Sequence, residues 1–334
     1  MSTRNMNQVH QLFFQGLATK DVELPIRHLA NGSYIEHTNL DGPQLLLTMA
    51  DADAALRDNG RLVEGAVLTV KMGDPGGRGD AYFASKFVVC SADPHGDHIR
   101  VEAIEAGVYL AKQPVVKPLF FNGMTAKEIL GKVFPGYKVE VVGPDVKHTY
   151  HVTAGATPSS VLRLLERDMG ACIWVARGAV YCVPYLDMMR RQLKGAPITF
   201  EYGRPGGAHP ITGYTPLGVG TLVNRAVRRN YYVWDTVKGM VRGAADRDAP
   251  PAILTGVNAG ALEVASRRLD PCLLADVMGN GQYAAGLAVA VRLHRYDKES
   301  VIDESVPPSQ VIMTVSHTQT SNSYHCKVTT GVAR

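Results

Sequence analysis

Short apolar runs separated by glycine- and proline-rich turns are the feature that most limits how this chain folds. The run Gly65–Met72 ends at the turn cluster Gly73–Gly77, and two further runs, Phe83–Cys90 and His98–Ala103, flank the segment Asp93–Asp97. Runs of this length with partial alternation are typical of strands, and Asp, Pro and Gly between two of them predict a hairpin loop. Strands at this spacing, with little helix between them, predict a small antiparallel barrel or sandwich.

The length of 334 residues exceeds what one typical core organises, so two or three domains are expected. We predict an N-terminal arm over residues 1–22, in which the amphipathic segment Val9–Leu17 either docks onto a neighbour or frays. A first β-barrel domain is predicted over residues 23–115, a mixed α/β middle domain over residues 116–190 and a second β-barrel domain over residues 191–334.

The predicted middle domain contains two copies of a helix followed by strands. Thr125 and Glu128 have the spacing of a capping box, which starts a short helix ahead of a strand at Lys138–Val142. A second helix is predicted from Thr157-Pro158 to Gly170, because proline is tolerated in the first turn and glycine ends helices. Two strands then follow, joined by a tight turn at Arg177-Gly178: Cys172–Val175 and Ala179–Val183.

The last third of the chain repeats the strand pattern of the first domain. Residues 286–293, like residues 65–72, begin with glycine and end in an apolar, a basic and an apolar residue. In both places a loop, an apolar strand, a polar turn and a last strand follow in this order. In the first domain the two strands are Phe87–Cys90 and His98–Ala103. In the last third they are Val311–Val315 and Tyr324–Thr329. The predicted fold is therefore mainly β, with two related small antiparallel β-barrels flanking the mixed α/β domain.

Composition narrows the classes of function. Basic residues exceed acidic ones by four, which is too small an excess to indicate nucleic acid or an anionic membrane as a partner. The longest apolar run, Ala284–Val291, is far too short to cross a bilayer, and the start of the chain is polar, so neither membrane insertion nor a secretory signal is expected. The five cysteines are scattered and lack C-x-x-C spacing, which indicates free, mostly buried thiols.

No group of residues forms a convincing reactive site. Asp93, His95, Asp97 and His98 are metal-type side chains, but they lie on the predicted hairpin turn, where such residues are common. His148 and His151 fall on opposite faces of a strand. The segment Gly279–Ala284 matches a loose dinucleotide fingerprint without the strand and helix that a real one needs. We therefore predict no catalytic, cofactor-binding or metal-binding residue.

The order of these elements resembles the tail hub family of contractile-tailed phages, which is shared with the spike proteins of type VI secretion. The resemblance covers most of residues 23–330. It is carried by the strand Val67–Asp74, by the helix and hairpin from Thr157 to Tyr181, and by the strand Val311–His317 with its return strand at Tyr324.

The resemblance implies a non-catalytic structural virion protein in the tail baseplate, assembled in the host cytoplasm. It implies a homotrimer whose six barrels adapt a sixfold tail tube to a threefold spike, around a channel for the tape-measure protein and for DNA that is not specifically bound. Two alternatives remain open. A tail-associated peptidoglycan hydrolase would need paired carboxylates in a cleft, and Glu102, Glu105, Glu128 and Glu140 have no motif around them. A glycan-binding module would need an exposed aromatic groove.

Overall fold

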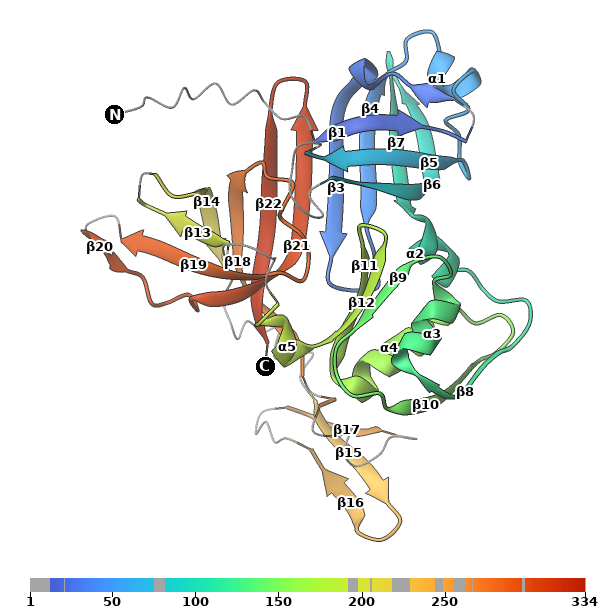
Figure 1. Ribbon diagram of the computed structural model, residues 1–334, viewed down its shortest axis with the longest axis vertical. Helices are drawn as coiled ribbons and strands as arrows, with labels where there is room; N and C mark the ends of the chain where they lie inside the picture. Colours follow the sequence, from blue (N-terminus) through green and yellow to red (C-terminus); the bar gives the residue numbers. More distant parts are fainter. Residues whose placement is uncertain are drawn as a thin grey trace.

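A computed structural model describes residues 13–20, 22–74, 82–191, 198–204, 206–217, 229–243, 249–254, 262, 264–265, 267–295 and 298–333. It is mainly β with a mixed α/β unit in the middle of the chain, which confirms the predicted mainly β class with an α/β insertion (Figure 1). Most strands belong to one 14-stranded sheet, and three small sheets stand apart from it.

The N-terminal part of the large sheet is an open run of strands in the order β2-β1-β5-β6-β7-β4-β3. Its inner side holds a core of large apolar residues that includes Phe14, Tyr34 and Phe87. Its elements are β1 (Phe14–Ala18), β2 (Glu23–Leu24), the short 3-10 helix η1 (Ile26–His28), β3 (Leu29–His37), β4 (Gln44–Ala50), α1 (Ala55–Asp58), β5 (Val67–Gly73), β6 (Tyr82–His95) and β7 (His98–Glu105).

The C-terminal part pairs six strands in a closed circuit, β14-β18-β22-β21-β19-β13, because β13 pairs with both β19 and β14. A second core, which includes Phe200, Tyr283 and Val315, fills this circuit. The strands are β13 (Thr199–Tyr202), β14 (His209–Pro216), β18 (Leu269–Met278), β19 (Ala288–Arg295), β20 (Lys298–Ile302), β21 (Ser309–Thr320) and β22 (Tyr324–Ala333).

Five strands of each part form a repeat with one topology. We call β3, β4, β5, β6 and β7 the first repeat, and β14, β18, β19, β21 and β22 the second. In chain order these strands correspond one to one, and both repeats pair them antiparallel in the same succession, β3-β4-β7-β6-β5 and β14-β18-β22-β21-β19. The sixth strand differs, because β1 runs antiparallel to β5 whereas β13 runs parallel to β19.

The two repeats also share two of their register shifts. The ladder between β6 and β7 skips Cys90, and the ladder between β21 and β22 skips Met313. In the same way, the β3–β4 ladder skips Ala30 and the β14–β18 ladder skips Thr212. Extra residues at equivalent places bend a strand in a defined way, so they are a stricter sign of relatedness than shared strands.

The glycine that opens each sequence repeat has the same backbone role. Gly65 adopts a φ of +79° and donates its N–H to the carbonyl of Val89, and Gly286 adopts a φ of +83° and donates to the carbonyl of Ile312. Positive φ values favour glycine because an L side chain is strained there. The predicted correspondence of residues 65–72 with residues 286–293 is therefore confirmed at the level of backbone hydrogen bonds.

The two repeats join directly through β3 and β21, which pair antiparallel from Asn31–Thr320 to His37–Thr314. Hence the middle domain separates the repeats in the sequence but not in the sheet. Figure 1 shows the middle unit below this junction, with the hairpin of β11 (Ala171–Ala176) and β12 (Ala179–Pro184) extending up toward it.

The middle unit packs helices on a small mixed sheet, β11-β12-β9, with the two-stranded sheet β10-β8 beside it. The predicted capping box is present at Thr125 and Glu128, and Gly170 ends the second helix in the left-handed conformation. The elements are α2 (Ala106–Ala111), β8 (Leu119–Thr125), α3 (Ala126–Val133), β9 (Lys138–Val141), β10 (Lys147–Val152), α4 (Pro158–Met169), β11 (Ala171–Ala176), β12 (Ala179–Pro184) and α5 (Tyr185–Met188).

The predicted N-terminal arm is too long. Strand β1 pairs with β5, and Phe13, Phe14 and Leu17 are almost completely buried in the first core. The apolar stripe that suggested an amphipathic docking segment is therefore a strand of the same domain. Residues 1–12 of that arm lie outside the described residues. The other predicted domain boundaries remain predictions.

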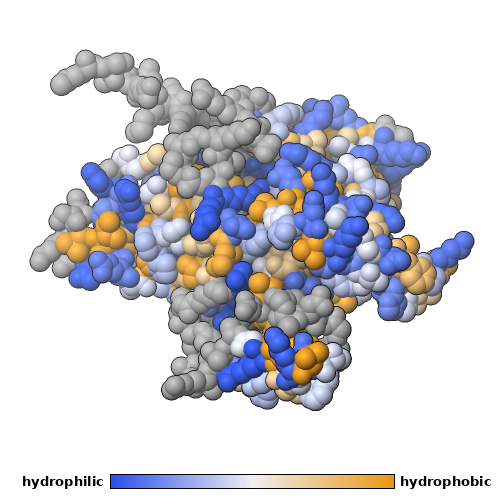
Figure 2. Space-filling model, turned by 60° about the horizontal axis from the view of Figure 1, so that its bottom comes forward, coloured by the Kyte–Doolittle hydropathy of each residue, from blue (hydrophilic) through white to orange (hydrophobic). Residues whose placement is uncertain are grey.

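The second repeat carries an insertion, residues 217–268, where the first repeat has only the short connection 38–43. Its described part is a three-stranded sheet of β15 (Asn230–Asp235), β16 (Gly239–Arg242) and β17 (Pro251–Leu254), which projects from the molecule (Figure 1). Figure 2 shows apolar side chains at the surface of this region between hydrophilic ones. No helix among the described residues is long and apolar enough to cross a membrane.

Candidate functional site

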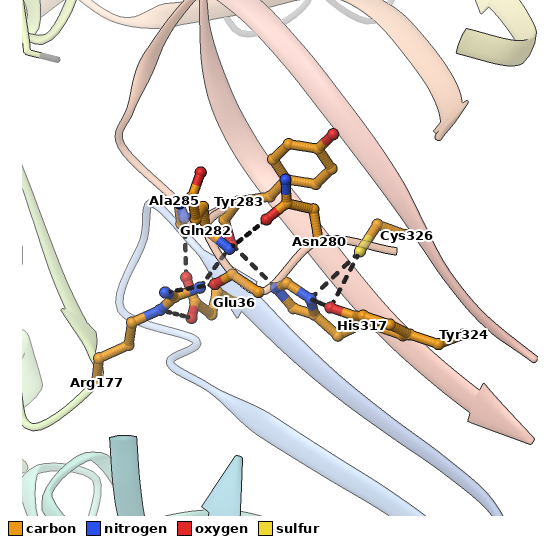
Figure 3. Close-up of polar contacts among 10 residues, drawn as sticks. Glu36, Arg177, Asn280, Gln282, Tyr283, Ala285, His317, Tyr324 and Cys326 are labelled. Carbon is orange, nitrogen blue, oxygen red and sulfur yellow. Dashed lines mark hydrogen bonds and ion pairs between the residues drawn. The ribbon is translucent and has the colours of Figure 1, made fainter. Parts of the chain in front are cut away.

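The three parts of the chain meet at one buried polar cluster, which is the candidate site. Arg177 comes from the turn between β11 and β12, Glu36 from β3 of the first repeat, and the loop 279–287 from the second repeat (Figure 3). The turn residues Arg177 and Gly178 both have positive φ, +52° and +76°, as a tight two-residue hairpin turn requires. That turn places the guanidinium between the two repeats.

The Arg177 guanidinium donates hydrogen bonds to three partners. Its Nε donates to Glu36 Oε1 at 2.8 Å, while its two terminal nitrogens donate to the carbonyls of Gly281 at 2.8 Å and Tyr283 at 2.6 Å. Its central carbon also lies 4.7 Å from the centre of the Phe83 ring. Arginine suits such a site because its donors are fixed in a plane.

Glu36 completes the link between the repeats, since its other carboxylate oxygen accepts the backbone N–H of Ala285 at 2.9 Å. Both charged side chains are buried, with Glu36 fully inaccessible and the Arg177 side chain 6% exposed. Buried charges are tolerated when they are paired and hydrogen-bonded, and removing one partner leaves the other uncompensated. The pair therefore acts as an obligatory link among the first repeat, the middle unit and the second repeat.

His317 continues the cluster on the second repeat and is neutral. Its Nε2 lies 3.0 Å from the carbonyl of Tyr283, which only accepts, so Nε2 carries the proton and Nδ1 accepts from the Tyr324 hydroxyl at 2.8 Å. Burial, together with the positive charge of Arg177, holds the pKa of His317 well below its usual value. The side chain therefore serves as a fixed hydrogen-bonding group.

Cys326 lies 3.3 Å from His317 Nδ1, a pairing that resembles a thiol nucleophile with its base. Burial raises the pKa of Cys326 to about 11, and the thiol is fully buried. A reactive cysteine needs a lowered pKa and an accessible sulfur. The Cys326–His317 pair is therefore part of the core and lacks the properties of a nucleophilic site.

Aromatic rings enclose this polar cluster. Phe13 stacks on His317 with ring centres 4.4 Å apart, and Tyr34 and Phe83 pack beside them at 6.0 and 6.3 Å from Phe13. Burial and the Glu36 carboxylate raise the pKa of Tyr34 well above its usual value. The rings exclude water from the ion pair, which strengthens its hydrogen bonds.

A second contact fixes the β11–β12 hairpin to the second repeat. Trp174 is fully buried, stacks on Tyr181 with ring centres 4.9 Å apart, and packs so tightly on Gly286 that an added Cβ would lie 2.3 Å from its ring. The Arg191 guanidinium lies over the Tyr181 ring at 4.4 Å. Trp174 therefore anchors the hairpin to the second repeat.

The sequence motifs that suggested ligands occupy other roles. Asp93, His95, Asp97 and His98 lie at the end of the β6–β7 hairpin, where Asp97 pairs with His98 at 2.6 Å on the surface. Within the described part of the chain, no group of three or more such side chains is arranged to hold a metal ion. The segment Gly279–Ala284 is the loop whose carbonyls accept from Arg177 and His317, and it leads into strand β19, not into a helix.

The remaining candidates are dispersed. His148 is half-buried against Tyr150 while His151 is exposed, as expected for opposite faces of β10. Glu105 caps α2, Glu128 closes the capping box and Glu140 pairs with Lys138 at 2.6 Å, so three of the four glutamates have structural partners. All five cysteines are free, and only Cys90 is exposed.

Sequence reasoning missed Glu36 and the junction role of Arg177. One signal for Glu36 was present, because Tyr34 and Glu36 share one face of a strand by the two-residue period, so a buried Tyr34 places Glu36 inward. An inward acidic residue needs a cationic partner. No local pattern indicates which arginine supplies the charge, because Arg177 lies 141 residues away.

Comparison with known proteins identifies the fold. No protein-family model matches the sequence, and neither does any curated protein sequence. A tail protein from Neisseria meningitidis MC58 is similar over 95% of both chains, with a TM-score of 0.64 and 10% sequence identity. The 43 kDa tail protein of prophage MuSo2 from Shewanella oneidensis is similar over 95% of this chain and 97% of its own, with a TM-score of 0.60 and 13% identity.

A type VI secretion component has the same fold. The E. coli c3393 protein, itself described as similar to the T4 bacteriophage tail proteins gp27 and gp5, is similar over 96% of this chain and 77% of its own. The TM-score is 0.55 and the identity 10%. The chain therefore has the fold of phage tail proteins and of a type VI secretion component, which confirms the resemblance inferred from the sequence at the level of fold.

Proposed function

We propose that this protein is a non-catalytic structural component of a phage tail or related injection machine, and that it forms the central hub between tail tube and spike. The observation that carries the proposal is the five-strand repeat with two matched register shifts and a matched glycine, found in a chain of which 95% has the fold of tail proteins. A repeat of this kind supplies two similar building blocks in one polypeptide.

The hub is a homotrimer. Three chains with two repeats each approximate sixfold symmetry without six identical subunits, so one face matches a sixfold tube and the other a threefold spike. The buried Glu36–Arg177 pair and the loop that accepts from Arg177 tie the two repeats of each chain together. The ring encloses a channel through which the tape-measure protein and DNA pass, and DNA is not specifically bound. The protein resides in the tail baseplate of the virion and assembles in the host cytoplasm.

The proposal is tested by locating the protein in particles from cells that encode it. An epitope tag at Arg334 and immunogold electron microscopy are expected to label the end of the tail tube, and loss of the chain is expected to leave tubes without spikes. Label along the tube, on the head or on no particle would contradict the hub assignment. A tagged, unrelated head protein serves as the control for labelling efficiency.

A binding role is the second candidate, and the sheet β15–β17 favours it. Trp234, Met240 and Ile253 are 66%, 50% and 64% exposed, and the Arg242 guanidinium lies over the Tyr232 ring at 6.0 Å. Strand pairing places these residues on one face. Exposed aromatic faces with a neighbouring cation are typical of binding surfaces for partners or glycans. Binding to purified peptidoglycan that is lost in Trp234→Ala would support this role.

A further inference from the structure

The insertion 217–268 of the second repeat ends in an exposed apolar tip. The turn between β15 and β16 lies at the far end of the projecting sheet (Figure 1). The Asp235 carboxylate accepts the backbone N–H groups of Val237 and Lys238, both at 2.8 Å, and Gly239 follows with a φ of +75°. These contacts fix a turn in which the Val237 side chain is 90% exposed.

One face of the sheet β15–β17 continues this apolar surface. Trp234 pairs with Met240, and Ile253 lies on the same face because it pairs with Tyr232, two residues before Trp234. Trp234, Met240 and Ile253 are each at least half exposed, whereas Val233 on the opposite face is only 5% exposed. The sheet therefore has one covered face and one apolar face that is open to solvent.

The insertion also carries the net positive charge of the chain. Residues 217–268 contain eight lysines and arginines and four aspartates and glutamates, whereas the rest of the chain contains 27 of each kind. The excess of four, which indicates no partner when it is spread over the whole chain, is thus concentrated in one segment. Lys238 and Arg242, on either side of the apolar residues of β16, are exposed. An apolar tip in a cationic segment favours an anionic partner.

We propose that the β15–β16 tip binds the surface of an anionic lipid bilayer. Val237 and Trp234 lie in the interfacial layer, and Lys238 and Arg242 face the headgroup phosphates. Tryptophan is enriched at membrane interfaces, and each lysine or arginine beside an anionic leaflet strengthens the attraction. The contact is peripheral, because its strength comes from a small buried apolar area together with charge. It goes beyond the proposed hub role and does not depend on it.

Two other occupants fit these features less well. A glycan stacks on aromatic rings, and the aliphatic Val237 at the tip adds nothing to such a contact. A stable protein interface involves roughly 20–30 residues a side, and the open face of a short three-stranded sheet is small for that. A protruding aliphatic side chain between two cations instead suits a bilayer, in which hydrocarbon lies just beneath a layer of phosphates.

Sedimentation of the full chain with lipid vesicles tests the proposal. The protein is expected to bind mixed vesicles of phosphatidylglycerol and phosphatidylethanolamine, and to bind phosphatidylcholine vesicles at least about tenfold more weakly. Val237→Asp is expected to weaken binding to the anionic vesicles about tenfold or more, because it places a carboxylate at the headgroup boundary. Val116→Asp is the matched control, a 91% exposed valine of the middle unit, and is expected to bind like the wild type.

The cations and the tryptophan supply two further measurements. Lys238→Gln with Arg242→Gln is expected to weaken binding roughly 30-fold, since each cation contributes about fivefold. The chain has two tryptophans and Trp174 is fully buried, so a change of emission on adding vesicles reports Trp234. We expect a shift to shorter wavelength, which Trp234→Phe abolishes while the chain still sediments with the vesicles. Circular dichroism checks that each variant is folded.

The outcomes distinguish the bilayer from the other occupants. Absence of binding to anionic vesicles overturns the proposal, as does an equal loss of binding in Val116→Asp and Val237→Asp. Equal binding to phosphatidylcholine vesicles overturns the anionic partner. Without vesicle binding, capture by peptidoglycan assigns the face to a glycan, and loss of Val237→Asp chains from tail particles assigns it to a tail protein. Vesicle binding is measured on the purified chain, so its result is separate from the position of the protein in the particle.

Discussion

The first and second repeats share a backbone design but differ in what surrounds it. Gly65 and Gly286 have the same positive φ and the same hydrogen bond, yet a Cβ on Gly65 would meet nothing within 4 Å, whereas one on Gly286 would meet the Trp174 ring. The second repeat also carries the loop that Arg177 binds and the insertion 217–268. The two repeats therefore have the same backbone arrangement but different contacts. The second repeat contacts both the Trp174 ring and the Arg177 guanidinium of the middle unit.

The largest effect is expected from Arg177→Ala, which removes the link between the middle unit and both repeats. Glu36 would remain buried without its partner, so the free energy of unfolding is expected to fall by about 3–5 kcal/mol. Urea denaturation followed by circular dichroism measures this change. Arg163→Ala, at an exposed position of α4, is the control and is expected to change stability by less than about 0.5 kcal/mol.

A double variant tests whether the charges of Glu36 and Arg177 are what makes this link important for stability. The double variant Glu36→Gln with Arg177→Met removes both charges and is expected to be more stable than Arg177→Ala, because neither charge is then left buried alone. A double variant that is no more stable than Arg177→Ala would show that the link acts through packing and not through its ion pair.

The glycine pair gives the next largest contrast. Gly65→Ala is expected to cost about 1 kcal/mol, because alanine is strained at positive φ. Gly286→Ala adds a clash with Trp174 and is expected to cost about 2–4 kcal/mol in total. Denaturation midpoints of the two variants provide the comparison, and equal costs would contradict the close packing of Trp174 on the second repeat.

His317 is expected to make the free energy of unfolding depend on pH. The first repeat has Pro94 at the equivalent position and therefore lacks this titratable group. The pKa of His317 is held well below its usual value in the folded protein, so the unfolded chain takes up the proton first as the pH falls. Stability is therefore lost below pH ~6.5, by up to about 1.4 kcal/mol per pH unit.

Unfolding measured from pH 7.5 to pH 5 tests this effect. The His317→Gln variant is expected to be less stable at pH 7.5 but to lose less stability on acidification. The exposed His325→Gln is the control and is expected to keep the wild-type slope. The difference between wild type and variant isolates His317, because other groups contribute equally to both. A His317→Gln variant with an unchanged slope would contradict the assignment of His317 as a buried neutral histidine.

Local signals predicted the elements well. The capping box at Thr125 and Glu128, the helix from Pro158 and the hairpin turn at Arg177 depend on neighbours in the sequence, so the sequence contains their physical cause. The echo between residues 65–72 and 286–293 was also visible, because a glycine at positive φ and an alternating strand leave a local pattern.

Long-range features were not predictable in the same way. The sequence predicts an arm where strand β1 lies, because the strand's partner β5 lies more than 50 residues further along the chain. The direct pairing of β3 with β21 and the partner of Glu36 depend on how distant segments meet, and no local pattern specifies that. The candidate site lies at these long-range contacts, which is why its residues escaped sequence reasoning.

The central claim is that two related repeats per chain build a threefold hub. Light scattering behind a sizing column, over a series of concentrations and with tube and spike proteins added, tests it most directly. We expect a particle of three chains of 36.1 kDa each, formed at high concentration or on addition of the partners. A chain that remains monomeric under all these conditions, or that forms particles of two or four copies, would contradict the account.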